Sequence, residues 1–275
     1  KSNGLNRSMS AKKLMAGKRG LIMGVANQHS IAWGIAKAAH DHGAELAFTF
    51  QGEAFEKRVR PIAESVNAAA CLPCNVATDE SIKETFEALG KVWDSFDFVV
   101  HAIAYSDKEE LKGRYVDTTR NNFRHTLDIS CFSFTSVAKY AEPMLRPGGS
   151  LLTLTYEGAQ RVMPSYNVMG VAKAALEASV KYLAVDLGRN GVRVNALSAG
   201  PMRTLAGSAI AGARFTYNWQ GKSSPLRRNI ELEEVGNSGL YLISDLSGGV
   251  TGEVHYVDSG YHLVGMAIPA ETDLE

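Results

Sequence analysis

The chain has 275 residues, 45% of them hydrophobic, so it can bury a large core and fits one α/β domain. Its 29 basic and 29 acidic residues balance without long runs of either sign, which predicts neither nucleic acid nor a membrane surface as a partner. No apolar stretch approaches the roughly 18 residues that a membrane span requires. We expect residues 1–13 to form a flexible polar arm, residues 266–275 a tail, and the protein to be cytoplasmic.

Apolar runs alternate with helical patterns in an unbroken strand–helix series. The predicted strands are Arg19–Gly24, Glu45–Phe50, Ala69–Asn75, Phe96–Ile103, Ser150–Thr155, Val192–Ser198 and Glu253–Val257. The predicted helices are Ile31–His42, Glu53–Val66, Asp79–Val92, Arg120–Leu145, Ser165–Leu187 and Glu231–Ser244. This series predicts a doubly wound, Rossmann-type parallel sheet of about seven strands with helices on both faces, in a single domain over residues 14–265.

Two segments interrupt the alternation. Residues 106–119 are polar and irregular, and residues 202–225 are rich in glycine, alanine and serine. Each follows a predicted strand, so each is expected at the carboxyl edge of the sheet, where such folds bind ligands. We expect residues 202–225 to form a substrate-binding lid.

Two of the three cysteines, Cys71 and Cys74, lie three positions apart on a predicted strand. Residues at this spacing point to opposite faces of a sheet. The cysteines are therefore interpreted as buried, reduced thiols rather than as a redox or zinc pair, and no metal site is expected.

A candidate dinucleotide-binding segment follows the first predicted strand. Gly24 suits the turn out of the strand, where a Cβ atom would clash. Ser30 is expected to cap the next helix, and its hydroxyl and the first free amides, beginning at Ile31, can bind pyrophosphate oxygens. The helix is expected to approach the sheet closely through its small residues Ala32, Gly34 and Ala36.

Residues at the ends of the next strands indicate which nucleotide binds. Gln51 can hydrogen-bond a ribose hydroxyl and Glu53 would repel a 2′-phosphate, whereas Lys57 and Arg58 favour one; on balance the sequence predicts NADH rather than NADPH. The adenine edge is expected to meet Asn75 and Val76.

The fourth strand closes beneath the cofactor, where Ala102 is expected to contact it. The neighbouring His101 is open to a packing role or a catalytic one.

The most informative pattern is Tyr156-x9-Tyr166-x6-Lys173. Seven residues are close to two helical turns, so on one helix Tyr166 and Lys173 would share a face. An ammonium near a phenol lowers the pKa of the phenol, which favours proton transfer near neutral pH.

Four segments together resemble the short-chain dehydrogenase/reductase superfamily and, within it, the divergent bacterial NADH-dependent enoyl-acyl-carrier-protein reductases. They are Gly24-x5-Ser30-x-Ala32-x-Gly34, the Tyr156–Tyr166–Lys173 pattern, the run 164–170 and the run 193–201, followed by residues 202–206. The resemblance covers residues 12–264. Its discriminating feature is Tyr-x6-Lys, because ordinary members of the superfamily carry Tyr-x3-Lys.

The resemblance implies hydride transfer from NADH to the β-carbon of a trans-2-enoyl thioester. Tyr166 would donate a hydrogen bond to the developing enolate, Lys173 would bind the nicotinamide ribose, and Tyr156 would line the acyl pocket. Met202 and Thr204 would bracket the carboxamide. The remaining acyl-pocket residues would be Met169, Ala206 and Ile210, with Ala104 beside the nicotinamide.

The resemblance also implies an enoyl substrate carried on acyl carrier protein and a homotetramer with the last strand and the long helices at its interfaces. Two other functions stay open: a ketone or alcohol reductase of the superfamily, and a non-catalytic dinucleotide sensor. Many ketone-reducing relatives use a serine about thirteen residues before the tyrosine. That position is Thr153 here, inside a predicted strand.

Overall fold

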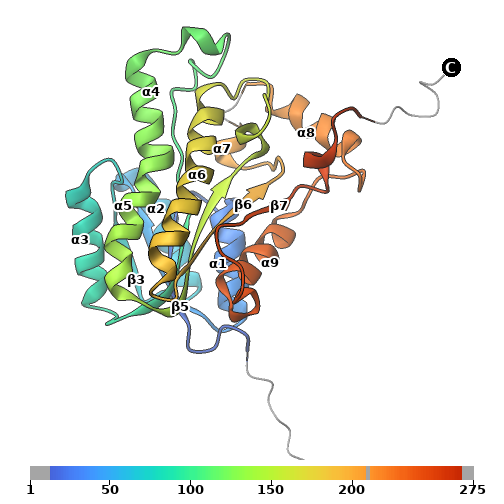
Figure 1. The fold of residues 1–275 in the computed structure, drawn as a ribbon. Helices are drawn as coiled ribbons and strands as arrows, with labels where there is room; N and C mark the ends of the chain where they lie inside the picture. Colours follow the sequence, from blue (N-terminus) through green and yellow to red (C-terminus); the bar gives the residue numbers. More distant parts are fainter. Residues whose placement is uncertain (1–12, 209–210, 268–275) are drawn as a thin grey trace, which may run out of the picture.

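The computed structural model describes residues 13–208 and 211–267, which form one twisted sheet between two layers of helices (Figure 1). All neighbouring strands pair in parallel, in the order β3-β2-β1-β4-β5-β6-β7. The strands are β1 (Arg19–Met23), β2 (Glu45–Phe50), β3 (Ala70–Pro73), β4 (Phe96–His101), β5 (Leu145–Thr155), β6 (Arg193–Ala199) and β7 (Val254–Val257). The predicted doubly wound, seven-stranded parallel sheet is confirmed.

Helices cover both faces of the sheet. They are α1 (Ile31–Asp41), α2 (Gly52–Ser65), α3 (Asp79–Gly90), α4 (Arg120–Leu127), α5 (Ser133–Ala141), α6 (Val168–Gly188), α7 (Leu205–Ser208), α8 (Ala213–Ser223) and α9 (Leu232–Ile243). Short 3₁₀ or π turns are η1 (Tyr115–Asp117), η2 (Asp128–Phe132), η3 (Glu142–Met144), η4 (Glu157–Ala159), η5 (Asp245–Ser247) and η6 (Tyr261–Leu263).

The sheet separates two apolar cores. Along β1, Ile22 points into the core formed with α1, α2 and α9, whereas Leu21 and Met23 point into the core formed with α3, α5 and α6. This alternation follows from the two-residue repeat of a strand. Cys71 packs against the first core and Cys74 belongs to the second, which confirms their predicted opposite orientation.

The predicted helix over residues 120–145 is interrupted. The structure divides it into α4, the π turn η2 and α5, and β5 already begins at Leu145. Pro143 lies in the 3₁₀ turn η3 that follows α5. A proline lacks the amide hydrogen that would continue an α-helix, which explains why the helical pattern stops there.

Helix α1 packs closely against another helix through Gly34. A Cβ atom on Gly34 would lie 2.7 Å from the Leu232 side chain, and one on Gly236 would lie 2.5 Å from the Gly34 carbonyl oxygen. The expectation that Gly34 brings α1 close to the sheet was wrong, because the side of Gly34 on which a Cβ atom would lie faces α9. Ala32 and Ala36 are buried in the apolar core of α1, α2 and α9.

None of the helices within residues 13–208 and 211–267 is long and apolar enough to cross a membrane.

Candidate active site

The candidate site begins where the strand order reverses, between β1 and β4. The Ala102 amide donates to the Met23 carbonyl (3.0 Å), so the ends of the two strands are tied together. Gly24 follows with φ +99°, and a Cβ atom on it would lie 2.0 Å from the Ala102 carbonyl oxygen. Only glycine fits this turn, which leaves a side-chain-free approach to the carboxyl edge of the sheet.

Ser30 organises the loop before α1 rather than the helix itself. Its hydroxyl oxygen accepts from the backbone amides of Ala26 (2.9 Å) and Asn27 (3.1 Å), and it makes no capping hydrogen bond to α1. The expected side-chain cap was therefore wrong. The backbone hydrogen bonds of α1 begin with Trp33 and Gly34 donating to the Ser30 carbonyl, so the amide of Ile31 precedes them and can meet an anion.

The residues expected around the adenosine lie at the ends of neighbouring strands. Gln51 Nε2 donates to Asn75 Oδ1 (3.3 Å), which links the ends of β2 and β3. Asn75 is held in turn because its backbone amide donates to Ser81 Oγ (2.8 Å). Val76 follows it half-buried.

Tyr166 does not stand on a helix. The predicted helix start at Ser165 was wrong: α6 begins at Val168, and Ser165 and Asn167 have φ values of +56° and +40°. These positive φ values fold the chain into a turn around Tyr166. Tyr166 and Lys173 therefore come from a turn and from a helix, not from one helix face.

The Tyr166 ring fills a tight apolar site. It is 6% exposed and packs with Leu111, Met169 and Ala172. A Cβ atom on Gly158 would lie 2.3 Å from the ring, so only glycine fits against this face. Burial, followed by the influence of Tyr156 and Glu177, raises the pKa of Tyr166, which contradicts the expected lowering.

Tyr156 lies beside Tyr166 at the end of β5. The ring centroids are 5.1 Å apart with the planes at 77°, an edge-to-face contact. Gln220 of α8, only 2% exposed, donates from Nε2 to the Tyr156 hydroxyl oxygen (3.0 Å). Burial raises the pKa of Tyr156 as well.

Lys173 is a buried cation on α6, 7% exposed. Its Nζ donates to the Leu154 carbonyl oxygen (2.7 Å) on β5. Burial lowers the pKa of Lys173 to about 8, against weaker opposing effects from Cys131 and Glu177. The amine therefore stays mostly protonated at pH 7 and loses its proton as the pH rises through about 8.

His101 and Thr153 belong to the sheet. Thr153 is directly opposite His101 in the β4–β5 register, and its Oγ1 lies 3.1 Å from His101 Nδ1. The other ring nitrogen of His101 lies 2.8 Å from Ser133 Oγ. Burial lowers the pKa of His101 to about 3, so the ring is neutral. The structure supports the packing role for His101.

The other predicted pocket residues that the structure describes lie on two segments. Met202 packs against the core of α1, α2 and α9, and Thr204 Oγ1 accepts from the Gly207 amide (2.9 Å). Ala104 is exposed in the loop after β4. Ile210 lies outside the described residues, and so does the side chain of Ala206.

Sequence reasoning missed Asn167. Its Nδ2 lies within hydrogen-bond distance of the carbonyl oxygens of Glu110 (3.4 Å), Leu111 (3.2 Å) and Gly113 (3.3 Å), all in the loop that covers the Tyr166 cluster. The turn could have been predicted in part from the sequence, because asparagine is enriched among residues with positive φ. Gln220 and Glu177 were also missed, since their partners are distant in sequence.

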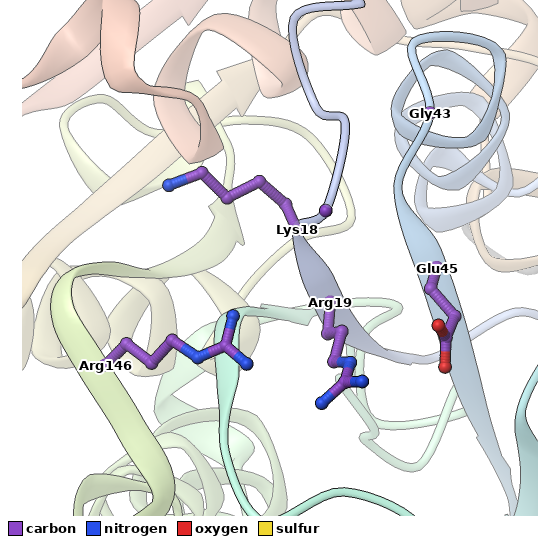
Figure 2. A pocket seen from close by; sticks show the side chains of 6 residues that line it. Lys18, Arg19, Gly43, Glu45 and Arg146 are labelled. Atoms are coloured by element: carbon purple, nitrogen blue, oxygen red, sulfur yellow. The ribbon is translucent and has the colours of Figure 1, made fainter.

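A hollow of about 210 Å³ lies at the opposite, amino edge of the sheet (Figure 2). Its cations already have partners: Lys18 Nζ lies 3.0 Å from Asp245 Oδ1, Arg146 Nη1 lies 3.2 Å from Asp97 Oδ2, and the Arg19 guanidinium lies 6.0 Å from the centre of the Trp93 ring. The chemistry-bearing residues are all at the carboxyl edge, so this hollow is not part of the candidate site.

Comparisons with known proteins agree with this fold. The NADH-dependent enoyl-acyl-carrier-protein reductase 2 of Rhizobium meliloti (strain 1021) is 63% identical over 253 residues, which cover 92% of this chain and 94% of that protein. The crystal structure of the reductase of Anaplasma phagocytophilum in complex with NAD matches with a TM-score of 0.91 at 57% identity, covering 95% of this chain and 100% of that one. The Bacillus cereus reductase with NADP⁺ and indole naphthyridinone matches with a TM-score of 0.90 at 48% identity, covering 92% and 100%. The family model for enoyl-(acyl carrier protein) reductase matches residues 24–262, and the chain belongs to this family.

Proposed function

We propose that Tyr166, Tyr156 and Lys173 carry out the reaction of this family in the chain. The protein is an oxidoreductase of fatty acid biosynthesis that reduces enoyl groups with NADH, as its family membership indicates. The two tyrosine rings lie 5.1 Å apart at the end of β5, and the Lys173 ammonium donates a hydrogen bond to Leu154 on the same strand. This arrangement supports the residue assignment.

The carboxyl edge of the sheet fits a dinucleotide. A pyrophosphate fits the turn at Gly24 and the first amides of α1, beginning at Ile31. The hydrogen bonds to the Ser30 hydroxyl hold this loop in shape. Gln51 and Asn75 suit the adenosine, with Val76 and Ala102 as walls, and Met202 and Thr204 suit the carboxamide. When bound, NADH supplies the hydride that is added to the β-carbon of the enoyl thioester.

Tyr166 acts as a hydrogen-bond donor to the thioester oxygen. Because burial raises its pKa, the phenol stays protonated throughout the neutral range and has its proton available as negative charge develops on that oxygen. The apolar packing around the ring excludes water, which strengthens this hydrogen bond. Lys173 binds the ribose hydroxyls of the nicotinamide half.

The acyl chain is assigned to the apolar surroundings of the two tyrosines. Met169 belongs to the same cluster as Tyr166, and Ala104, Ala206 and Ile210 are proposed to extend that wall. The substrate is proposed to be carried on acyl carrier protein, an acidic partner. Arg214 and Lys222 are exposed on α8 beside the site and suit such a partner.

We further propose a homotetramer in the cytoplasm. Two features support association of the subunits. One is the edge strand β7, and the other is an exposed apolar stripe on α6 that includes Tyr182 (78% exposed) and Val185 (69%).

The decisive experiment follows NADH absorbance with an enoyl thioester, such as crotonyl-thioester or a longer homologue, and then with simple ketones. The proposal expects oxidation of NADH with the enoyl thioesters alone. Oxidation with ketones alone would indicate the alternative carbonyl reductase, and NADH binding without any turnover would indicate a dinucleotide sensor.

A further inference from the structure

A second buried charge, Glu177, lies one helical turn beyond Lys173 on α6. Residues four apart lie on the same face of a helix, so both side chains point toward the end of β5. Glu177 is 4% exposed. A carboxylate with so little contact to water requires hydrogen bonds from the protein.

Glu177 receives its hydrogen bonds from the two ends of one short segment. Thr155 Oγ1 donates to Oε1 (2.7 Å), and Gln160 Nε2 donates to Oε2. Thr155 precedes Tyr156 directly, and Gln160 follows the turn η4. Since Lys173 also donates to Leu154, one face of α6 holds residues 154–160 at three points.

Glu177 is also the buried carboxylate that acts on Lys173. The groups that face Lys173 electrostatically are Glu177 on α6, the thiol of Cys131 on η2 and the neutral ring of His101 on β4. Of these, Glu177 is the carboxyl group, whereas Cys131 is a thiol whose pKa burial raises. Burial, the largest effect, lowers the pKa of Lys173, and Cys131 and then Glu177 oppose it.

We propose that Glu177 is a positioning residue that keeps Lys173 protonated at neutral pH and ties the segment carrying Tyr156 to α6. The link to catalysis rests on the proposed function, because it requires Lys173 to bind the nicotinamide ribose. The charge itself can be tested without any substrate.

The test measures the titration of the Lys173 amine by ¹⁵N NMR in lysine-labelled protein. Glu177→Gln keeps the shape of the side chain and removes its charge, so the midpoint should fall by about one pH unit, which corresponds to a tenfold weaker binding of the proton. Asp186→Asn, an exposed change on the same helix, is the matched control and should leave the midpoint in place. An unchanged midpoint in folded Glu177→Gln would overturn the proposal.

A double variant keeps the proposal testable if Glu177→Gln folds poorly. Lys173→Met/Glu177→Gln removes both charges and should regain part of the Tm lost in Glu177→Gln alone, since the buried amine is then no longer left without its counter-charge. Strictly additive losses of Tm would contradict the coupling.

NADH affinity separates this inference from the proposed function. In Glu177→Gln the affinity should fall about fivefold near pH 8 and recover on acidification, because a lower pH restores the proton on Lys173. If the titration midpoint of Lys173 falls but NADH affinity is unchanged, the effect of Glu177 on the charge of Lys173 is supported and the ribose-binding role of Lys173 is wrong.

Discussion

Burial shifts the pKa values of Tyr166 and Lys173 in opposite directions. Burial disfavours the charged form of each, so it raises the pKa of the phenol and lowers that of the ammonium. The phenol is thereby held as a proton donor, whereas the lysine becomes sensitive to its electrostatic neighbours.

Replacement of the two residues should separate chemistry from binding. Tyr166→Phe removes one hydrogen-bond donor and should lower kcat on the order of 100-fold, about 3 kcal/mol in the barrier, with NADH affinity nearly unchanged. Lys173→Ala should weaken NADH binding itself. Absorbance assays and NADH fluorescence titrations check both, and the reverse pattern would mean that the roles are exchanged.

His101 should make the fold sensitive to acid. Its pKa is lowered from 6.5 to about 3 by burial, so between these values the unfolded chain binds a proton that the folded chain does not. Stability is therefore unaffected above 6.5 and falls as the pH drops below it, by about 2 kcal/mol near pH 5. Urea midpoints near pH 7 and pH 5 measure this loss.

The matching variants are His101→Gln, which should lose less stability between the two pH values than the wild type, and His29→Gln, an exposed control that should behave like the wild type. Equal losses in His101→Gln and the wild type would show that another group governs the acid response.

At the scale of elements, α9 depends on a charged cap. The Glu231 amide donates to Glu234 Oε2 (2.8 Å), and both terminal nitrogens of Arg228 donate to the Glu234 carboxylate. These contacts, with the Arg228 hydrogen bonds as the largest cause, lower the pKa of Glu234 to about 2. The cap holds the start of the helix that meets Gly34 of α1.

Loss of this cap should destabilise the protein modestly. Glu234→Ala removes the acceptor and the ion pair, and should reduce the free energy of unfolding by about 1 kcal/mol. Glu234→Gln retains an acceptor for the Glu231 amide and should lose less. Thermal unfolding followed by circular dichroism compares the two, and equal losses would mean that the backbone cap contributes nothing.

The sequence predicted the order and type of these elements well, because hydrophobic periodicity is local. It did not predict the start of α6, since the turn with positive φ at Ser165 and Asn167 is stabilised by a loop more than fifty residues away. The role of Gln220 was missed for the same reason, because its partner Tyr156 lies 64 positions away in the sequence. Ser30 was placed correctly at the helix start, but the direction of its hydrogen bonds depends on the loop conformation.

At the scale of the whole molecule, the apolar stripe of α6 predicts association. Val185→Asp places a charge in the proposed interface and should convert the proposed tetramer into smaller species. Sedimentation velocity measures the change. Glu87→Ala on α3, an exposed position outside the stripe, should leave the assembly intact, and an unchanged tetramer in Val185→Asp would place the interface elsewhere.

The triple attachment of Asn167 has a mechanical consequence. The side-chain amide that holds the covering loop belongs to Asn167, the residue next to Tyr166, so the loop and the phenol are mechanically coupled. A displacement of the loop would therefore also pull on the peptide that orients the Tyr166 hydroxyl.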